Sequence, residues 1–98
     1  MAHVEKNAAA SRYEMQVEGR TAVVQFRDEP DGSVRLIHTE VPDALEGRGI
    51  GSRLAKGVLE VIRAEGRMVV PQCEFIAAYL CRHPEYQDLV APRPDERT

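Results

Sequence analysis

Three glycines within five residues, in the stretch EGRGIGSRL at positions 46–54, constrain this chain more than any other feature. Glycine loses more conformational freedom on folding than any other residue, so such a cluster indicates a backbone geometry that other residues do not adopt. The stretch leads directly into a helical pattern. The first turn of a helix leaves backbone N–H groups unpaired, and the helix dipole favours negative charge there. The sequence therefore predicts a loop that an anion such as a phosphate can approach closely.

Spacing alone leaves two interpretations of this loop. It lacks the Lys-Ser or Lys-Thr pair of a P-loop, and the GxGxxG pattern of dinucleotide-binding proteins is not met. The pattern Gly47-x-Gly49-x-Gly51 fits a phosphate site, and it also fits a tight loop before a capped helix. The elements around the loop must decide between them.

Three strands are predicted before the loop. Polar and apolar residues alternate at 12–17, Gly19 marks a reversal, and a second strand follows at 20–27. The turn PDG at 30–32 precedes a third strand, 33–42, so the three strands form an antiparallel meander. A period of two divides the third strand into two faces, which are Val34, Leu36, His38 and Glu40 on one side and Arg35, Ile37, Thr39 and Val41 on the other.

The second half of the chain alternates helices with a short strand. Apolar spacing predicts a helix from about Gly49 to Glu65, with a left-handed cap at Gly66. Gly57 inside this helix costs about 0.5–1 kcal/mol relative to alanine, which indicates close packing against the sheet. The apolar run 68–70 predicts a buried strand parallel to its neighbour. The helix that follows ends before Pro84 and directs four side chains inward, namely Phe75, Ile76, Tyr79 and Leu80.

Length and composition indicate one small soluble domain. We expect a folded domain at 12–90 between flexible termini at 1–11 and 91–98. Hydrophobic residues make up 43% and charged residues 30%, which is typical of a globular protein. A net charge of −3 without a basic stripe argues against a nucleic acid partner. No apolar run reaches the ~20 residues of a membrane span, and no signal peptide is evident, so a cytoplasmic location is expected.

The segments HTEVP at 38–42, LEGRGIGSRLAKGVLE at 45–60 and VVPQCEFIAAYLCRHPEY at 69–86 occur in an order that resembles the GNAT acetyltransferase superfamily. The pyrophosphate loop of that superfamily reads Arg/Gln-x-x-Gly-x-Gly/Ala, which Gly49 and Gly51 match, while Glu46 replaces the usual basic or amide residue. The resemblance covers residues 12–86 and is closest to small members of about 90 residues. It implies a minimal GNAT fold of the α+β class with a mixed sheet, and an acetyl-CoA-dependent N-acetyltransferase.

The resemblance also implies a binding site for coenzyme A. The pyrophosphate would lie on backbone N–H groups of five residues, namely Arg48, Gly49, Ile50, Gly51 and Ser52. The pantetheine arm would pass between the third and fourth strands near Thr39 to Val41, with a main-chain N–H near Val41 facing the thioester oxygen.

Four side chains are candidates for the chemistry. Glu40 is the candidate base, directly or through water, and burial on the face of Val34 and Leu36 would strengthen its hold on a proton. His38 could substitute for it. Tyr79 could protonate the departing thiolate, with Tyr86 as a weaker alternative. Glu40, His38 and Tyr79 also have plainer interpretations, as a solvated carboxylate, a structural histidine and a core tyrosine respectively.

The two cysteines raise separate possibilities. Cys73 opens the second helix, where backbone N–H groups favour a thiolate, so it could accept the acetyl group before the amine does. Cys81 is most simply a small apolar side chain, and the absence of a secretory signal argues against a disulfide. A zinc site from Cys73, Cys81 and His83 would need a fourth ligand and a tighter arrangement, so no metal is expected.

Three functions therefore compete. The first is acetyl transfer from acetyl-CoA to an amine on a small molecule or a protein lysine. The second is a non-catalytic module or accessory subunit that binds coenzyme A or acyl-CoA, because the segments that shape the acceptor pocket in larger relatives are missing. The third is an interaction domain in which the glycines only tighten a loop. The sequence specifies neither the acceptor nor the oligomeric state.

Overall fold

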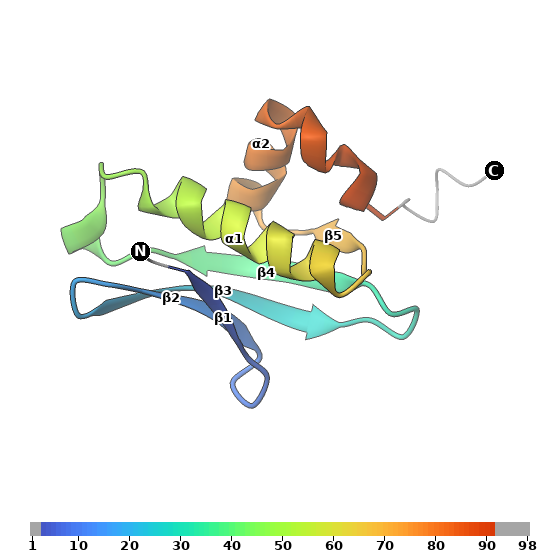
Figure 1. Cartoon of the computed structure of the whole chain (residues 1–98), viewed down its shortest axis with the longest axis horizontal. Coiled ribbons are helices and arrows are strands. Elements are labelled where there is room, and N and C mark those ends of the chain that lie inside the picture. The colour runs from blue at the N-terminus through green and yellow to red at the C-terminus, as the bar shows by residue number, and fades with distance from the viewer. Residues whose placement is uncertain (1–2, 92–98) are drawn as a thin grey trace.

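A computed structural model describes residues 3–91, and its centre is one mixed sheet with the strand order β1-β2-β3-β4-β5 (Figure 1). The strands are β1 (Val4–Asn7), β2 (Arg12–Val17), β3 (Arg20–Asp28), β4 (Val34–Glu40) and β5 (Val69–Pro71). The helices are α1 (Ile50–Ala64) and α2 (Glu74–Arg82), with short 3-10 turns η1 (Asp43–Leu45) and η2 (Pro84–Leu89). Neighbouring strands are antiparallel except β4 and β5, which are parallel. The predicted α+β class with a mixed sheet is confirmed.

The predicted flexible N-terminus is wrong for the part of it that forms β1. Val4–Asn7 pairs with β2 in a register that sets Val4 opposite Met15 and Asn7 opposite Arg12. Val4 is the only apolar residue of VEKN, so no alternation marks this strand in the sequence. Pairing with the edge of β2 and burial of Val4 order it. Of the expected flexible C-terminus, 91–98, only Ala91 lies within the described residues, and its N–H donates to the Val69 carbonyl.

Helix α1 covers the antiparallel part of the sheet, on the same side as α2 (Figure 1). Its bounds agree with the predicted helix to within one residue at each end. Its buried face consists of Ile50, Leu54, Ala55, Val58, Leu59 and Ile62. These side chains join Tyr13, Met15, Val24 and Phe26 of the sheet in the core. None of the helices within residues 3–91 has the length and apolar composition to cross a membrane.

A bulge in β4 overturns the predicted division of that strand into two faces. Phe26 pairs with Leu36, but the next residue back, Gln25, pairs with His38, so Ile37 is an extra residue in β4. An extra residue reverses the alternation of side chains beyond it. His38 and Glu40 therefore lie on the outer face of the sheet, opposite Leu36, and Thr39 lies on the helix-covered face. The prediction from a period of two is wrong here because the bulge arises from the pairing register with β3. The sequence of β4 alone does not show that register.

Strand β5 ends early and leaves part of β4 open. It pairs only with Val34–Leu36, and the N–H of Cys73 then donates to the Leu36 carbonyl at 2.9 Å. The chain turns away at that point into α2. The half of β4 from Ile37 to Glu40 thus has β3 on one side and no strand on the other among the described residues. This open edge faces the beginning of α1.

We predict that Gly57→Ala destabilises the protein, although alanine is the better helix former. A Cβ at position 57 would lie 2.4 Å from Cγ2 and 3.1 Å from Cβ of Val4, so β1 would have to shift. We expect the free energy of unfolding in urea to fall by about 1–2 kcal/mol. In a Val4→Ala background only the 3.1 Å approach to Cβ remains, so the same substitution should cost less. Equal losses in both backgrounds would show that Val4 does not require the glycine.

Candidate functional site

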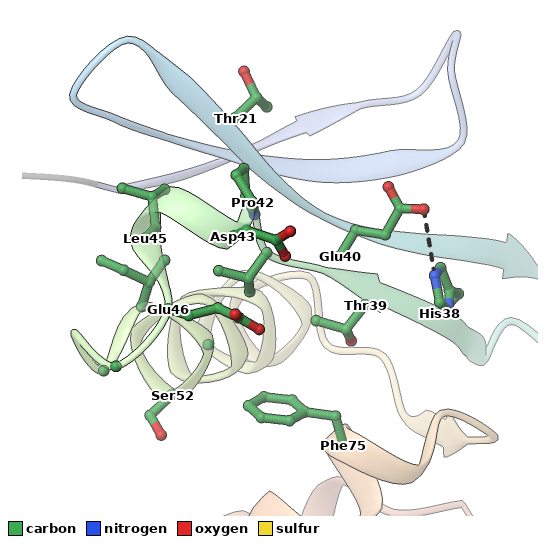
Figure 2. A pocket seen from close by; sticks show the side chains of 15 residues that line it. Thr21, His38, Thr39, Glu40, Pro42, Asp43, Leu45, Glu46, Ser52 and Phe75 are labelled. Atoms are coloured by element: carbon green, nitrogen blue, oxygen red, sulfur yellow. Dashed lines mark ion pairs between the residues drawn. The ribbon is translucent and has the colours of Figure 1, made fainter.

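A cavity of about 810 Å³ opens where β4 leads through a loop into α1 (Figure 2). We call it the loop cavity. Its lining comes from 38–43, 45–47 and 49–52, together with Thr21 of β3 and Phe75 of α2. Residues far apart in the sequence therefore meet at the open edge of β4. Of the sequence-predicted binding residues, Thr39, Val41 and 49–52 line it, and Arg48 does not.

The loop presents the beginning of α1 to the cavity. Gly47 and Gly49 have φ of 79° and 70°, the left-handed region that favours glycine. Gly49 is the N-cap residue of α1, no side chain caps the helix, and the first turn carries no acidic residue. The backbone N–H groups of that turn therefore have no side-chain acceptor. This end of the helix is suited to an anion.

The Arg48 side chain is turned away from the loop cavity. It forms an ion pair with Glu18 in the turn between β2 and β3. Its hydrogen bond lowers the pKa of the Glu18 carboxyl, and the same bond raises the pKa of Arg48. Arg48 therefore tethers the loop to the sheet and does not line the cavity.

His38 and Glu40 line the cavity from the outer face of the sheet. Nε2 of His38 lies 3.4 Å from Oε1 of Glu40, the pair drawn as a dashed line in Figure 2. Their side chains are 55% and 63% exposed, so the predicted burial of Glu40 beside Val34 and Leu36 is wrong. The bulge at Ile37 is the cause. The two candidate bases are solvent-accessible and adjacent.

Cys73 lies next to the cavity without lining it. It is the N-cap residue of α2 and is 8% exposed. Its Sγ lies 3.2 Å from Oγ1 of Thr39, and either group can donate the hydrogen bond. Thr39 lines the cavity, so Cys73 is linked to the cavity lining through this hydrogen bond. Both cysteines are free thiols, with Cys81 exposed.

The structure does not bring Tyr79 to the cavity. The residue is 3% exposed and its ring stacks on His83 with centroids 3.9 Å apart. Burial raises the pKa of the Tyr79 hydroxyl, and the carboxylates of Glu85 and Glu60 add to that effect. Tyr86 donates a 2.5 Å hydrogen bond to Oε2 of Glu60, away from the cavity. Both tyrosines pack between α2, η2 and α1.

The sequence analysis missed several lining residues, of which Phe75 departs most from expectation. It was predicted to point inward, but it is 38% exposed and lines the cavity. The buried face of α2 is Ile76, Tyr79 and Leu80, a spacing of three and four residues that excludes Phe75. That spacing was a signal available in the sequence.

The charge of the cavity lining is one-sided. Glu40, Asp43 and Glu46 contribute carboxylates, while the lining includes no lysine or arginine. Within residues 3–91 no group of three His, Cys, Asp or Glu side chains is arranged to hold a metal ion. An anion bound at α1 would therefore depend on backbone N–H groups.

Comparisons with known proteins agree with this geometry. The sequence model of the GCN5-related N-acetyl-transferase family matches residues 12–89. Protein NATD1 of Xenopus tropicalis is 39% identical over 62 residues, which are 63% of this chain and 57% of that protein. Human NATD1 is 41% identical over 61 residues, 62% of this chain and 54% of its own length. The matches thus span little more than half of these relatives.

A solved structure shares the fold. The solution structure of a GCN5-like protein from Staphylococcus aureus superposes with a TM-score of 0.69 over 97% of this chain and 93% of that one. The two sequences are 23% identical. The minimal GNAT fold expected from the sequence is confirmed, with β1 as a further strand.

We predict a graded loss of stability on substitution of Gly49. Its φ of 70° and the open space around its Cβ position mean that backbone conformation alone limits the side chain. Asparagine tolerates this region, alanine costs about 1–2 kcal/mol, and valine costs more. Urea unfolding should therefore rank the proteins as glycine, asparagine, alanine and valine, from most to least stable. Ser52→Ala, in the exposed first turn, is the control. A Gly49→Ala variant as stable as wild type would refute the left-handed conformation at position 49.

Proposed function

Because the chain belongs to the GCN5-related N-acetyltransferase family, we propose that it transfers an acetyl group from acetyl-CoA to an amine. The observation that carries the proposal is the loop cavity, which joins the uncapped start of α1 to the open edge of β4. The start of α1 suits a diphosphate, and the open edge of β4 suits a thioester. We also propose the cytoplasmic location that the sequence led us to expect.

The diphosphate of the carrier would be held by backbone N–H groups of 49–52. The cavity lining offers no cationic side chain, and Glu46 opposes an anion, so amides and the helix dipole must supply the attraction. Gly49 permits the left-handed backbone conformation with which the loop enters α1 beside the cavity. Arg48 contributes by fixing the loop to Glu18.

The thioester would lie along the open edge of β4, near Thr39 and Val41. There the amine attacks the thioester carbon, a C–N bond forms, the C–S bond breaks, and coenzyme A leaves as a thiolate. Main-chain N–H groups on an unpaired strand edge can stabilise the negative charge that develops on the carbonyl oxygen. Stabilisation of that oxygen needs no side chain.

Glu40 and His38 would remove the proton from the incoming amine. An alkylammonium group has a pKa of about 10.4 and must lose a proton before it attacks. Glu40 accepts it directly or through water, and His38, 3.4 Å away, can accept it in turn or replace Glu40. Tyr79 remains a predicted acid without support from its position, and solvent in the open cavity is the simpler proton source for the thiolate.

The acceptor we propose is a cationic amine, either a small molecule or an exposed lysine of a protein. Glu40, Asp43 and Glu46 surround the cavity with negative charge and would attract such a group. The exposure of Glu40 and His38 also suits an acceptor that approaches from the outer face of the sheet.

A second candidate is a non-catalytic module or accessory subunit that binds acyl-CoA. It is favoured by the absence of Tyr79 from the cavity lining and by the solvent exposure of Glu40 and His38. A measurement of thioester turnover distinguishes the two candidates, because only the enzyme consumes acetyl-CoA.

We predict that the wild-type protein binds coenzyme A in calorimetry and consumes acetyl-CoA with spermidine or a lysine peptide as acceptor. Glu40→Gln should lower the turnover rate about tenfold to a hundredfold without changing coenzyme A affinity, because general base catalysis contributes at least that much. The double variant with His38→Gln should lose more. Glu5→Gln, an exposed carboxylate of β1, is the control.

Two outcomes would count against this proposal. Binding without turnover would favour the non-catalytic module, and no binding at all would remove both candidates. Full turnover in the double variant would refute the role of Glu40 and His38 alone.

We predict that incubation with acetyl-CoA leaves the intact mass of the protein unchanged. Direct transfer is supported by the burial of Cys73 and by its absence from the cavity lining. A gain of one acetyl group that disappears in Cys73→Ser, and persists in Cys81→Ser, would instead establish the covalent route. The Cys81 variant is needed because that thiol is exposed and can acquire an adduct nonspecifically.

A further inference from the structure

The turn between β2 and β3 holds a glutamate in a conformation that glutamate rarely adopts. Val17 pairs with Arg20, so Glu18 and Gly19 are the two residues of this hairpin turn. Their φ angles are 50° and 77°, and both lie in the left-handed region. Two-residue turns of this kind favour asparagine, aspartate or glycine at the first position, because other side chains carry a free-energy penalty there. The turn itself therefore does not explain Glu18, and a contact outside it must.

The Glu18 carboxylate has such a contact, 30 residues further along the chain. Its Oε2 accepts a hydrogen bond from Nη2 of Arg48, in the loop that precedes α1. Within residues 3–91, no other side-chain hydrogen bond or ion pair involves the loop residues 46–49. The Arg48 side chain is 46% exposed and the Glu18 side chain 60%, so the pair is a tether on the surface.

The backbone on either side of Arg48 has unusual freedom. Gly47 and Gly49 both have positive φ, and a Cβ at either position would have nothing within 4 Å. Packing therefore does not confine these two residues, and glycine has more accessible backbone conformations than any other residue. The ion pair between Arg48 and Glu18 is thus the contact that restricts the loop. The two glycines are the positions at which the loop would move without it.

The hairpin that carries Glu18 is a firm support for this contact. Strand β2 pairs with β3 over its whole length, Arg12–Val17. Three residues after Glu18, Thr21 of β3 lines the loop cavity together with 45–47 and 49–52 (Figure 2). The end of the hairpin and the loop therefore meet at one cavity. The ion pair joins a regularly paired hairpin to a loop without another side-chain tie in the described part of the chain.

We propose that Glu18 is a positioning residue, which orders the loop through Arg48 and so sets the affinity of the start of α1 for a diphosphate. This inference rests on the proposed binding of coenzyme A. Neither side chain lines the cavity, so neither has to contact the ligand. With the loop already ordered, binding does not have to fix it, and the cost in conformational entropy is smaller. Without the pair, the anion must order the loop itself, and the affinity falls.

Replacement of Glu18 by asparagine separates this role from a structural one. Asparagine tolerates the left-handed turn better than glutamate does, so Glu18→Asn should leave the stability to urea unchanged or raise it. We expect calorimetry in about 0.15 M salt, which screens distant charges, to show coenzyme A binding about twofold to fivefold weaker, the range of an exposed ion pair. Glu5→Gln removes the same charge from an exposed position on β1 and should bind as the wild-type protein does.

A double-variant cycle with Arg48→Gln tests whether Arg48 acts only through Glu18. Arg48→Gln should weaken coenzyme A binding as much as Glu18→Asn does, because each substitution removes the same ion pair. In the Glu18→Asn background it should have little further effect. A further loss as large as in the wild-type background would show that Arg48 contacts the ligand directly, and would overturn the inference.

The outcomes also separate this inference from the proposed function. If the wild-type protein binds coenzyme A and Glu18→Asn binds it equally well, the inference alone is wrong. If the wild-type protein does not bind coenzyme A, the proposed function is wrong and the inference is overturned with it.

Discussion

The early end of pairing between β4 and β5 is the constraint on which the site depends. Three residues of β5 pair with Val34–Leu36, and the hydrogen bond from Cys73 to the Leu36 carbonyl then turns the chain into α2. Had β5 continued, its backbone would cover the edge of β4 from Ile37 onward. Because it stops, that edge stays open beside the first turn of α1, and the loop cavity forms between them.

The bulge at Ile37 determines what chemistry that edge can present. With an uninterrupted alternation, Glu40 and His38 would point into the core beneath the helices, where a charged carboxylate is unfavourable without a partner. The extra residue moves both to the outer face, where they are solvated and 3.4 Å apart. It also directs Thr39 to the inner face, against the thiol of Cys73. The open edge and the bulge together put His38 and Glu40 on one side of the strand and the loop cavity at its end.

Three glycines near and in α1 have three different physical reasons. Gly49 holds a left-handed φ before the helix, Gly51 makes room for the ring of Phe75, and Gly57 makes room for Val4 of β1. In the sequence they look alike. The last two depend on residues that lie more than twenty positions away in the chain, so only the first is a property of the local segment.

The sequence by itself determined the types and order of the strands and α-helices from 12 to 82, the loop before α1 and the family, because these follow from local periodicity, turn chemistry and motif order. Tertiary structure decided which face of the sheet carries Glu40 and His38, that Tyr79 packs in the core, that Phe75 reaches the cavity, and that Val4–Asn7 forms a strand. Each of these depends on contacts between distant segments. Among them are the pairing register of β4 with β3, the contact of the Phe75 ring with Gly51, and the pairing of β1 with the edge of β2. Local patterns carry no information about such contacts, because the same short sequence can satisfy its backbone and bury its apolar groups in more than one arrangement.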